Sequence, residues 1–232
     1  MRKKLLLWDI DGTLTYIALA GERAILAAWK KVMGYETTLE DVDYRGRTDV
    51  LIFQKLLTKH HEEHTHQRIH DLAEDYLASL PEEVKQANGN LHPGVLDILE
   101  QARQRPDIVQ GLLTGNLSQG AKIKLEHFDA WHYFEFGAFA NDSSNRNDLG
   151  PVALQRAAEK YGHEFHAEDT FIIGDTPHDI ACAKVIGANC IAVATGAFSV
   201  EDLSSHQPTV VFKDLSDAEA FFRVVDASVC CA

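Results

Sequence analysis

The chain alternates short apolar runs with stretches of helical periodicity, and this alternation limits its fold more than any other feature. Each apolar run is followed within two residues by Gly, Asp or Asn, as a buried strand is where it reaches a turn. Six runs predict strands, at residues 4–10, 108–113, 134–139, 170–173, 190–194 and 210–212. Helical patterns lie between them, at residues 95–103, 118–127, 152–161, 178–186 and 218–225. The alternation predicts an α/β protein with a largely parallel sheet flanked by helices.

Residues of about 15 to 90 break this alternation. Helical patterns fill the region at residues 18–33, 49–59 and 67–79, and no convincing strand accompanies them. Turn residues at Asn88-Gly89-Asn90 and His92-Pro93-Gly94 then return the chain to the sheet. We therefore expect a helical insertion after the first strand, in a chain whose 232 residues suffice for one core and a smaller unit.

Charge and composition exclude several classes of partner. The chain carries 22 Lys and Arg against 35 Asp and Glu, a net charge of −13 that would repel a nucleic-acid backbone or an anionic membrane surface. The apolar run near the N-terminus stops at Asp9, too early for a signal peptide, and no other stretch is long enough to span a bilayer. We expect no nucleic-acid or membrane partner, and a monomer or homodimer.

The four cysteines form no CxxC pair and no disulfide framework. They are Cys182, Cys190, Cys230 and Cys231. This spacing favours a reducing, cytoplasmic setting, with Cys182 and Cys190 as inert packing groups.

Carboxylates follow two of the predicted strands. Asp9 and Asp11 come directly after the first, and Asp175 and Asp179 come after the fourth. In an open parallel sheet, ligands bind beyond the carboxyl ends of the strands, so these side chains should share one crevice. Four carboxylates at one point repel each other unless a hard divalent cation lies among them. The pattern predicts Mg²⁺, and a bound Mg²⁺ in turn favours an anionic substrate.

A candidate phosphate-binding loop follows the second strand. Thr114, Gly115 and Asn116 offer a hydroxyl and backbone N–H groups just before a helix predicted to begin at about Ser118. A helix N-terminus attracts anions, and glycine lets the backbone approach closely. Alone, such a tripeptide is more often a turn with a helix cap.

Three segments together resemble motifs one, two and four of the haloacid dehalogenase superfamily. They are Trp8-Asp9-Ile10-Asp11-Gly12-Thr13-Leu14, Leu113-Thr114-Gly115-Asn116 and Gly174-Asp175-Thr176-Pro177-His178-Asp179. Residues 183–196 also resemble the phosphoglycolate-phosphatase-like branch. The resemblance implies a Rossmann-like catalytic core of residues 1–14 and 91–232, with residues 15–90 as a helical cap.

The resemblance also implies roles for these residues. Asp9 would attack phosphorus, and Asp11 would protonate the leaving group and then activate water. Asp9, the Asp11 carbonyl oxygen and Asp175 would bind Mg²⁺, with Asp179 bound directly or through another ligand. Thr114, Gly115 and Asn116 would hold the phosphoryl oxygens.

The residue at position 11 separates the reactions of the superfamily. Similar dehalogenases carry a different residue there, since displaced halide needs no proton, so Asp11 favours phosphate esters. The resemblance therefore implies a phosphatase of a small phosphorylated metabolite. A phosphomutase, a dehalogenase or a non-catalytic phospho-ligand-binding protein remains an alternative, although Leu14-Thr15-Tyr16-Ile17 lacks the Asp-Thr usual in phosphoglucomutases. The organic part of the substrate stays open.

Motif three is where the chain departs from the family pattern. A lysine is expected there, roughly 25 to 30 residues before the first Asp of motif four, to neutralise the nucleophile and the phosphate. No lysine lies between Lys124 and Lys160, but Arg146 precedes Asp175 by 29 positions. We predict that Arg146 takes this role, bridging Asp9 and a phosphoryl oxygen. The alternative is a surface arginine in a polar loop.

Two further patterns are ambiguous. Arg47 could reach over the crevice to an anionic group of the substrate, or the adjacent Thr48 could simply cap the helix that begins at Asp49. Five histidines at positions 60, 61, 64, 66 and 70 include two i, i+4 pairs. Because they lie in a charged stretch without an HExxH motif, we expect a solvated helix face or a helix junction there instead of a metal site.

Overall fold

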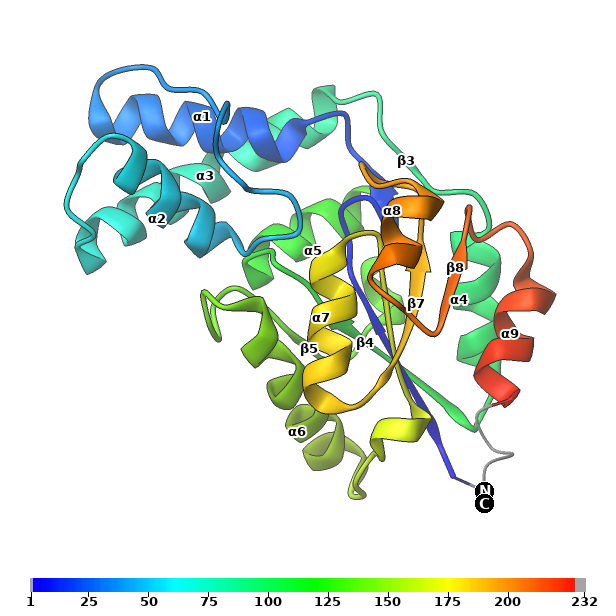
Figure 1. Cartoon of the computed structure of the whole chain (residues 1–232). Coiled ribbons are helices and arrows are strands. Elements are labelled where there is room, and N and C mark those ends of the chain that lie inside the picture. Colours follow the sequence, from blue (N-terminus) through cyan, green and yellow to red (C-terminus); the bar gives the residue numbers. More distant parts are fainter. Residues whose placement is uncertain (1, 228–232) are drawn as a thin grey trace.

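A single parallel sheet forms the centre of the computed structural model, which describes residues 2–227 (Figure 1). Its strand order is β5-β4-β1-β6-β7-β8, and every neighbouring pair is parallel. The strands are β1 (Lys4–Trp8), β4 (Ile108–Leu113), β5 (Gly137–Ala138), β6 (Thr170–Gly174), β7 (Asn189–Val193) and β8 (Val210–Phe212). The predicted α/β class is confirmed. Cys230 and Cys231 lie outside the described residues.

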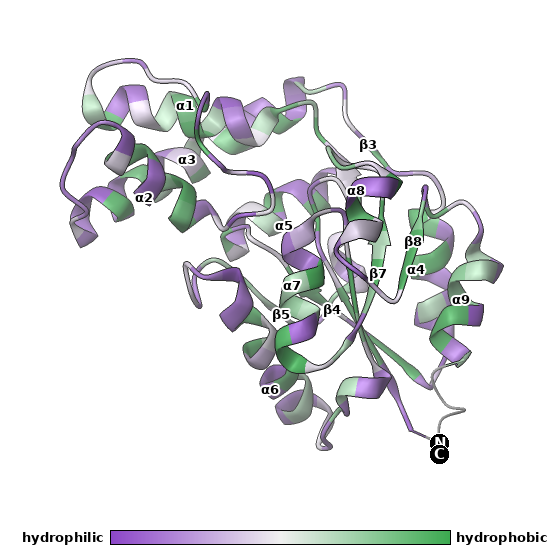
Figure 2. Cartoon of the chain, viewed as in Figure 1, coloured by the Kyte–Doolittle hydropathy of each residue, from purple (hydrophilic) through white to green (hydrophobic). Residues whose placement is uncertain are grey.

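Helices cover both faces of this sheet. Leu5 and Leu7 of β1 pack on one face and Leu6 and Trp8 on the other, as the two-residue period of a strand requires. The Leu5 face packs against α6 (Leu149–Tyr161), α7 (Pro177–Ile186) and α8 (Val200–Ser205). The Trp8 face packs against α4 (Val95–Gln104), α5 (Ser118–His127) and α9 (Ala218–Ala227). Figure 2 shows the apolar residues gathered on the strands and on the inner sides of these helices.

The segment between β1 and α4 folds into a helical bundle beside the carboxyl ends of the strands (Figure 1). Its helices are α1 (Ala20–Met33), α2 (Asp49–Lys59) and α3 (His66–Gln86), and they enclose an apolar core that includes Trp29 and Phe53. The two connections to the sheet pair with each other, as the antiparallel strands β2 (Thr15–Tyr16) and β3 (Asn90–Leu91).

Several elements differ from the sequence-based expectation. β5 is shorter than residues 134–139, because this edge strand pairs only with β4 and the chain before it forms the 3₁₀ turn η1 (Trp131–Tyr133). The two-residue strands β2 and β3 are too short to show a periodicity, so the expected absence of strands from residues 15–90 is wrong. α3 continues through Pro81 to Gln86 instead of ending at residue 79, and the short helix α8 was not predicted. No helix within residues 2–227 is both long and apolar enough to cross a membrane.

Candidate active site

The polar ends of β1, β4 and β6 open into one cavity of about 370 Å³, which lies between the sheet and the helical bundle. Its walls include residues from the first and sixth strand ends, the loop after β4, and the segments before α1 and α2. All of the candidate carboxylates except Asp179 border the cavity. The expectation that the strand ends share one crevice therefore describes the structure well.

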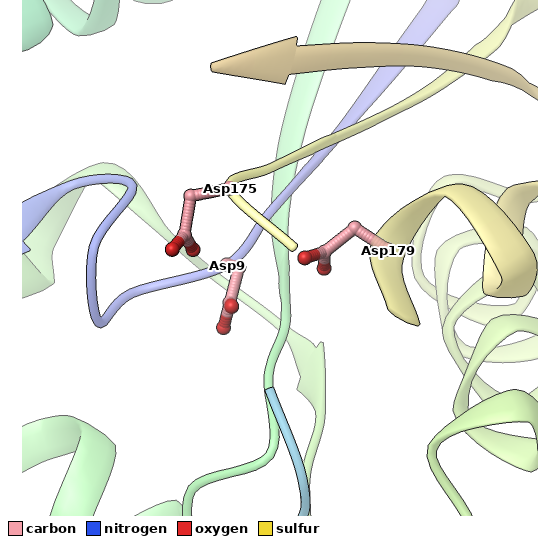
Figure 3. A group of neighbouring side chains, drawn as sticks. All are labelled: Asp9, Asp175 and Asp179. Carbon is pink, nitrogen blue, oxygen red and sulfur yellow. The ribbon is translucent and has the colours of Figure 1, made fainter. Parts of the chain in front are cut away.

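Three carboxylates meet at the base of this cavity. Asp9 follows β1, Asp175 follows β6, and Asp179 lies in the first turn of α7. All three are buried, and each offers an oxygen within 4.8 Å of the others (Figure 3). Burial raises the pKa of Asp9 to about 6, although Arg146 opposes the shift, and burial with the charges of Asp179 and Asp9 raises the pKa of Asp175 well above its ordinary value. Three buried carboxyl groups held so close together carry more negative charge than the single Arg146 cation compensates, so this all-oxygen set fits a hard cation such as Mg²⁺.

Glycines and a threonine fix the position of Asp175. Thr13 donates a hydrogen bond to Asp175 Oδ1 at 3.1 Å. A Cβ atom at Gly12 would come within 2.4 Å of Asp175 Oδ2, and one at Gly196 within 1.7 Å. Gly12 also has φ +80°, which disfavours any other residue. The close approach of both backbones therefore depends on glycine, and it leaves the Asp175 carboxylate directed toward Asp9.

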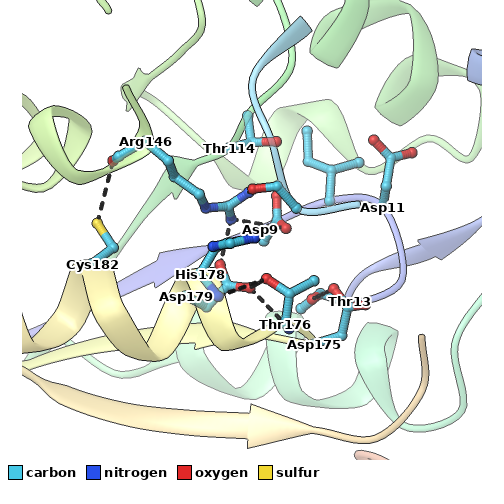
Figure 4. Close-up of polar contacts among 12 residues, drawn as sticks. Asp9, Asp11, Thr13, Thr114, Arg146, Asp175, Thr176, His178, Asp179 and Cys182 are labelled. Atoms are coloured by element: carbon cyan, nitrogen blue, oxygen red, sulfur yellow. Dashed lines mark hydrogen bonds and ion pairs between the residues drawn. The ribbon is translucent and has the colours of Figure 1, made fainter. Parts of the chain in front are cut away.

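Arg146 is the cation of the cluster. It lies at the start of η2 (Arg146–Asp148), is 5% exposed, and places Nη2 2.9 Å from Asp9 Oδ2. The same nitrogen pairs with Asp179 Oδ1, and Nη1 donates to the Gly46 carbonyl oxygen at 3.1 Å (Figure 4). Arg146 is thus a buried residue in contact with Asp9, not a surface arginine. Its Nε has no partner within residues 2–227 and remains a free donor.

Asp179 has a structural task that occupies both of its oxygens. Oδ2 accepts hydrogen bonds from the Thr176 backbone N–H at 3.0 Å and from Thr176 Oγ1 at 2.8 Å, which completes the capping box of α7. Oδ1 pairs with Arg146. Asp9 and Asp175 are consequently the better placed of the three for direct contact with a cation.

The loop after β4 lies beside this cluster (Figure 4). Thr114 is fully buried, and its Oγ1 accepts hydrogen bonds from Asn116 Nδ2 at 2.8 Å and from the Asn116 backbone N–H at 3.3 Å. A Cβ at Gly115 would come within 2.2 Å of the Arg47 carbonyl oxygen, so this glycine permits the loop and the bundle to touch. The three residues predicted to bind phosphate are therefore contiguous with the carboxylate site.

The Asp11 carboxylate stands apart from the other three. Its side chain is 43% exposed, and Oδ2 accepts hydrogen bonds from Asn116 Nδ2 at 2.8 Å and from Lys124 Nζ at 2.6 Å. The expectation of four carboxylates at one point is thus met by three. The turn around Gly12 separates Asp11 from the cluster, because the strand has ended and its alternation no longer applies.

Lys124 is a site residue that the sequence analysis missed. It lies on α5 and is only 3% exposed, although it is charged. The available signal was its position in the predicted helix, since Ala121 and Leu125 define a buried face and Lys124 falls on that face. A lysine within an apolar stripe needs a partner, and here the partner is Asp11.

Arg47 borders the cavity, but its guanidinium group is already paired. Nε and Nη2 lie 3.0 and 2.5 Å from Asp43 Oδ2. Thr48 accepts a hydrogen bond from the Leu51 backbone N–H at 3.2 Å, so the helix-cap interpretation of this segment is confirmed.

The five histidines do not share a helix. His60 is the C-cap of α2 and His64 lies in the following loop, so the predicted i, i+4 pairing of these two is wrong. His60 Nε2 lies 2.6 Å from Thr37 Oγ1 and packs against Trp29, while His64 Nε2 lies 3.0 Å from Thr58 Oγ1. Within residues 2–227, the aspartate cluster is the only close set of three or more potential metal-ligating side chains.

The two described cysteines are packing groups. Cys182 and Cys190 are buried and free, and burial raises the pKa of both thiols, to about 11 for Cys182. Thiols with raised pKa values are poor nucleophiles at neutral pH.

Comparisons with known proteins agree with this geometry. The family of haloacid dehalogenase-like hydrolases matches residues 6–184. A phosphoglycolate phosphatase of Vibrio parahaemolyticus is 27% identical over 226 residues, covering 92% of this chain and 93% of its own. Two solved structures share the fold. A predicted phosphoglycolate phosphatase from Haemophilus somnus has a TM-score of 0.73 at 18% identity, covering 96% of this chain and 99% of its own.

The second solved structure, the β-phosphoglucomutase of Clostridium difficile, has a TM-score of 0.75 at 16% identity, with both chains covered completely. Because structures named for different reactions fit this chain equally well, the fold alone does not choose between those reactions. The family match over residues 6–184 includes motifs one, two and four and the position of Arg146. The chain belongs to the haloacid dehalogenase-like hydrolases.

Proposed function

We propose that the protein is a Mg²⁺-dependent phosphatase that hydrolyses a small phosphate monoester through an aspartyl-phosphate on Asp9. The observation that carries this proposal is the buried contact between Asp9 and Arg146, which lies next to Asp175 and beside the loop that contains Thr114. It pairs a nucleophilic carboxylate with a cation that can neutralise a phosphoryl group. Asp11, which borders the same cavity, supplies the acid that a phosphate ester requires.

In the first step, an Asp9 oxygen forms a bond to phosphorus while the bond from phosphorus to the ester oxygen breaks. Asp11 donates its proton to that departing oxygen, which leaves as an alcohol. Arg146, the Thr114 hydroxyl and the Gly115 and Asn116 groups hold the phosphoryl oxygens, so that most of the rate enhancement comes from positioning and charge neutralisation.

In the second step, Asp11 accepts a proton from water as the water oxygen bonds to phosphorus. The bond between phosphorus and Asp9 breaks, which releases inorganic phosphate and restores both carboxyl groups. One residue thus serves as acid and then as base, and one difficult displacement becomes two easier ones.

Asp9, Asp175 and the Asp11 carbonyl oxygen would hold Mg²⁺, with Asp179 supporting the site through Arg146 and α7. When bound, the ion supplies positive charge against the phosphoryl oxygens and the clustered carboxylates. The glycine contacts around Asp175 support this assignment, since they hold one carboxylate in place without occupying the space beside Asp9.

We further propose that residues 1–14 and 91–232 form the catalytic core and that residues 15–90 act as a cap. Two contacts from the bundle support this division: the Gly46 carbonyl oxygen accepts from Arg146, and the Asp49 backbone N–H donates to the Gly115 carbonyl oxygen at 2.7 Å. Both contacts end on residues of the phosphate site. A cap held there would exclude water from the reacting groups.

A panel of phosphate monoesters tests the proposal, with 2-phosphoglycolate, sugar phosphates and 4-nitrophenyl phosphate assayed in Mg²⁺ and in EDTA. We expect hydrolysis that depends on Mg²⁺ and is lost in Asp9→Asn, whose amide is a far weaker nucleophile. Turnover within tenfold of wild type in that variant, or full activity in chelator, would contradict the mechanism. Phosphate transfer that requires a bisphosphate activator would identify a phosphomutase instead.

A further inference from the structure

Among the described residues that border the cavity, Lys124 is a buried cation to which the proposed mechanism gives no role, and it forms an ion pair with Asp11. We propose that Lys124 is a positioning residue for Asp11: it holds one carboxylate oxygen so that the other faces the leaving group of the substrate. This inference rests on the proposed function and adds a residue to it.

The hydrogen bonds of Asp11 are one-sided. Oδ2 accepts from Lys124 Nζ at 2.6 Å and from Asn116 Nδ2 at 2.8 Å, whereas Oδ1 has no protein partner within residues 2–227. Lys124 also donates to Asn116 Oδ1, and Asn116 Nδ2 donates to Thr114 Oγ1 at 2.8 Å. The ammonium group, the amide and the carboxylate therefore form a closed network that is tied to the phosphate-binding loop. Two donors on one oxygen fix the rotation of the carboxyl group.

The cavity lies on the free side of Asp11. Asp11, Asn116 and Lys124 all border it, and the Asp11 side chain is 43% exposed while that of Lys124 is 3% exposed. The anchored oxygen is thus on the protein side, and Oδ1 is the oxygen available to a bound ester. The proton transferred in the first step leaves Oδ1, where the O–H bond breaks as the O–H bond of the alcohol forms. Lys124 keeps its own protons throughout.

Packing alone does not account for a lysine at this position. The Lys124 ammonium group lies under α1, where a Cβ at Gly21 would be 3.5 Å from Nζ. Burial of a charge costs several kcal/mol before its partner compensates, and an apolar side chain of similar length would avoid that cost. Within the described chain, Asp11 is the only residue that forms an ion pair with Lys124, and the Asp11 side chain is 43% exposed. The Lys124 charge also stabilises the buried carboxylate of Asp49. The free-energy cost of burying the Lys124 charge is explained if Lys124 maintains the geometry of Asp11.

Arg146 and Lys124 therefore have different roles in the proposed mechanism. Arg146 contacts the nucleophile Asp9, and Lys124 contacts the acid Asp11. The two cations come from different elements, η2 and α5. Loss of Lys124 should therefore impair proton transfer and leave phosphate binding nearly intact.

The Lys124→Met variant tests the role of Lys124 when its activity is compared on two substrates with different leaving groups. An alkyl phosphate needs a well-placed proton, whereas the 4-nitrophenolate of 4-nitrophenyl phosphate leaves with little help. We expect kcat/KM to fall about tenfold or more for an alkyl phosphate and less than about threefold for 4-nitrophenyl phosphate, with KM for each changing less than about twofold. Lys122→Met is the matched control, since Lys122 lies on the same helix, is exposed and pairs only with Glu126. It should change neither substrate.

A double-mutant cycle separates positioning from a structural effect. If Lys124 acts through Asp11, Lys124→Met should cost less than about twofold when added to Asp11→Asn. Equal losses on the two esters, or losses that multiply in the double variant, would overturn the proposal. Should Lys124→Met not fold, Lys124→Arg keeps the charge but displaces the donor. It should show the same preference for the aryl ester at a smaller magnitude, and equal losses would again overturn the proposal.

These outcomes also separate this inference from the proposed function. A wild-type protein that hydrolyses no phosphate ester contradicts the function itself. A wild-type enzyme that requires Asp11 but shows multiplying losses for Lys124 contradicts only the role of Lys124.

Discussion

At Arg146, one guanidinium group serves two buried carboxylates, Asp9 and Asp179. The sequence-based hypothesis had this fork bridging Asp9 and a phosphoryl oxygen. In the structure Nη2 is instead shared by Asp9 and Asp179, and Nη1 donates to the Gly46 carbonyl oxygen. Removal of this cation leaves two buried charges uncompensated, which penalises the fold as well as the reaction.

We predict that Arg146→Ala lowers kcat/KM on the order of a hundredfold or more and also lowers the melting temperature. Arg146→Lys should recover only part of the activity, because an ammonium group cannot reach Asp9, Asp179 and Gly46 together. Arg156→Ala serves as the control, since Arg156 pairs with Asp142 in a more exposed position, and its effect should stay within about twofold. Steady-state kinetics on one phosphate monoester measures all three. A loss below about threefold for Arg146→Ala would rule out the assigned role.

Residue identity and strand position predicted the convergence of Asp9, Asp175 and Asp179, because parallel strands bring their carboxyl ends to one edge. They could not predict that Asp11 turns away, since this depends on the φ of Gly12 and on partners from α5. Lys124 was missed for a related reason: a lysine in a helical pattern reads as solvated until its neighbours in space are known.

At the scale of elements, the loop after β4 and the segment before α2 touch through Gly115. The Arg47 carbonyl oxygen lies where a Cβ of residue 115 would project, and the adjacent Asp49 N–H bonds to the Gly115 carbonyl oxygen. The contact joins the proposed cap to the phosphate site, so its geometry should matter to catalysis.

Gly115→Ala should therefore push the two segments apart and reduce kcat/KM about tenfold or more, with a fall in melting temperature. Gly120→Ala is the matched control in α5, because a Cβ there meets nothing closer than 3.5 Å and alanine favours a helix. That variant should keep full activity and unfold at the same or a higher temperature. Equal behaviour of the two variants would show that the Gly115 contact has no special role.

Helix and strand positions in the core followed from periodicity, because most of these elements have one clear apolar face or are buried throughout. Residues 108–113, 118–127 and 210–212 were bounded as observed. The failures have local causes. α3 continues through Pro81, although proline disfavours a helix interior, and so extends beyond the predicted end at residue 79. The pairing of β2 with β3 joins residues so far apart in sequence that no local pattern reveals it.

At the scale of the whole molecule, a chain of net charge −13 places four cations beside five carboxylates at one cavity. Arg45, Arg47, Lys124 and Arg146 all border it. Beside them, the buried carboxylates of Asp9 and Asp175 have raised pKa values, which means that the metal-free fold favours their protonated forms. Since the pKa of Asp9 rises from 3.8 to about 6 on folding, its contribution to the stability of metal-free protein falls as pH rises between these values.

A bound cation should restore the stability that the metal-free protein loses as pH rises, and it should do so only when Asp9 is ionised. We predict that Mg²⁺ raises the melting temperature clearly at pH 7.5 and much less at pH 5, where Asp9 is mostly protonated and binds the ion poorly. Thermal unfolding at several Mg²⁺ concentrations measures the effect at each pH. Asp175→Asn should remove it. Equal stabilisation at both pH values, or stabilisation that persists in Asp175→Asn, would contradict the assigned metal site.

The proposed mechanism requires a covalent phosphoryl group at Asp9, and one trapping experiment tests for it directly. Asp11→Asn should form the aspartyl-phosphate from 4-nitrophenyl phosphate but hydrolyse it slowly, because the second step needs Asp11 as base while the aryl leaving group needs little acid. Acid quench followed by borohydride reduction converts an aspartyl-phosphate to homoserine, which peptide mass spectrometry locates. We predict homoserine at position 9 only, with none when substrate is omitted. Homoserine at another aspartate, or an unmodified Asp9 during a measured burst of 4-nitrophenol, would contradict the mechanism.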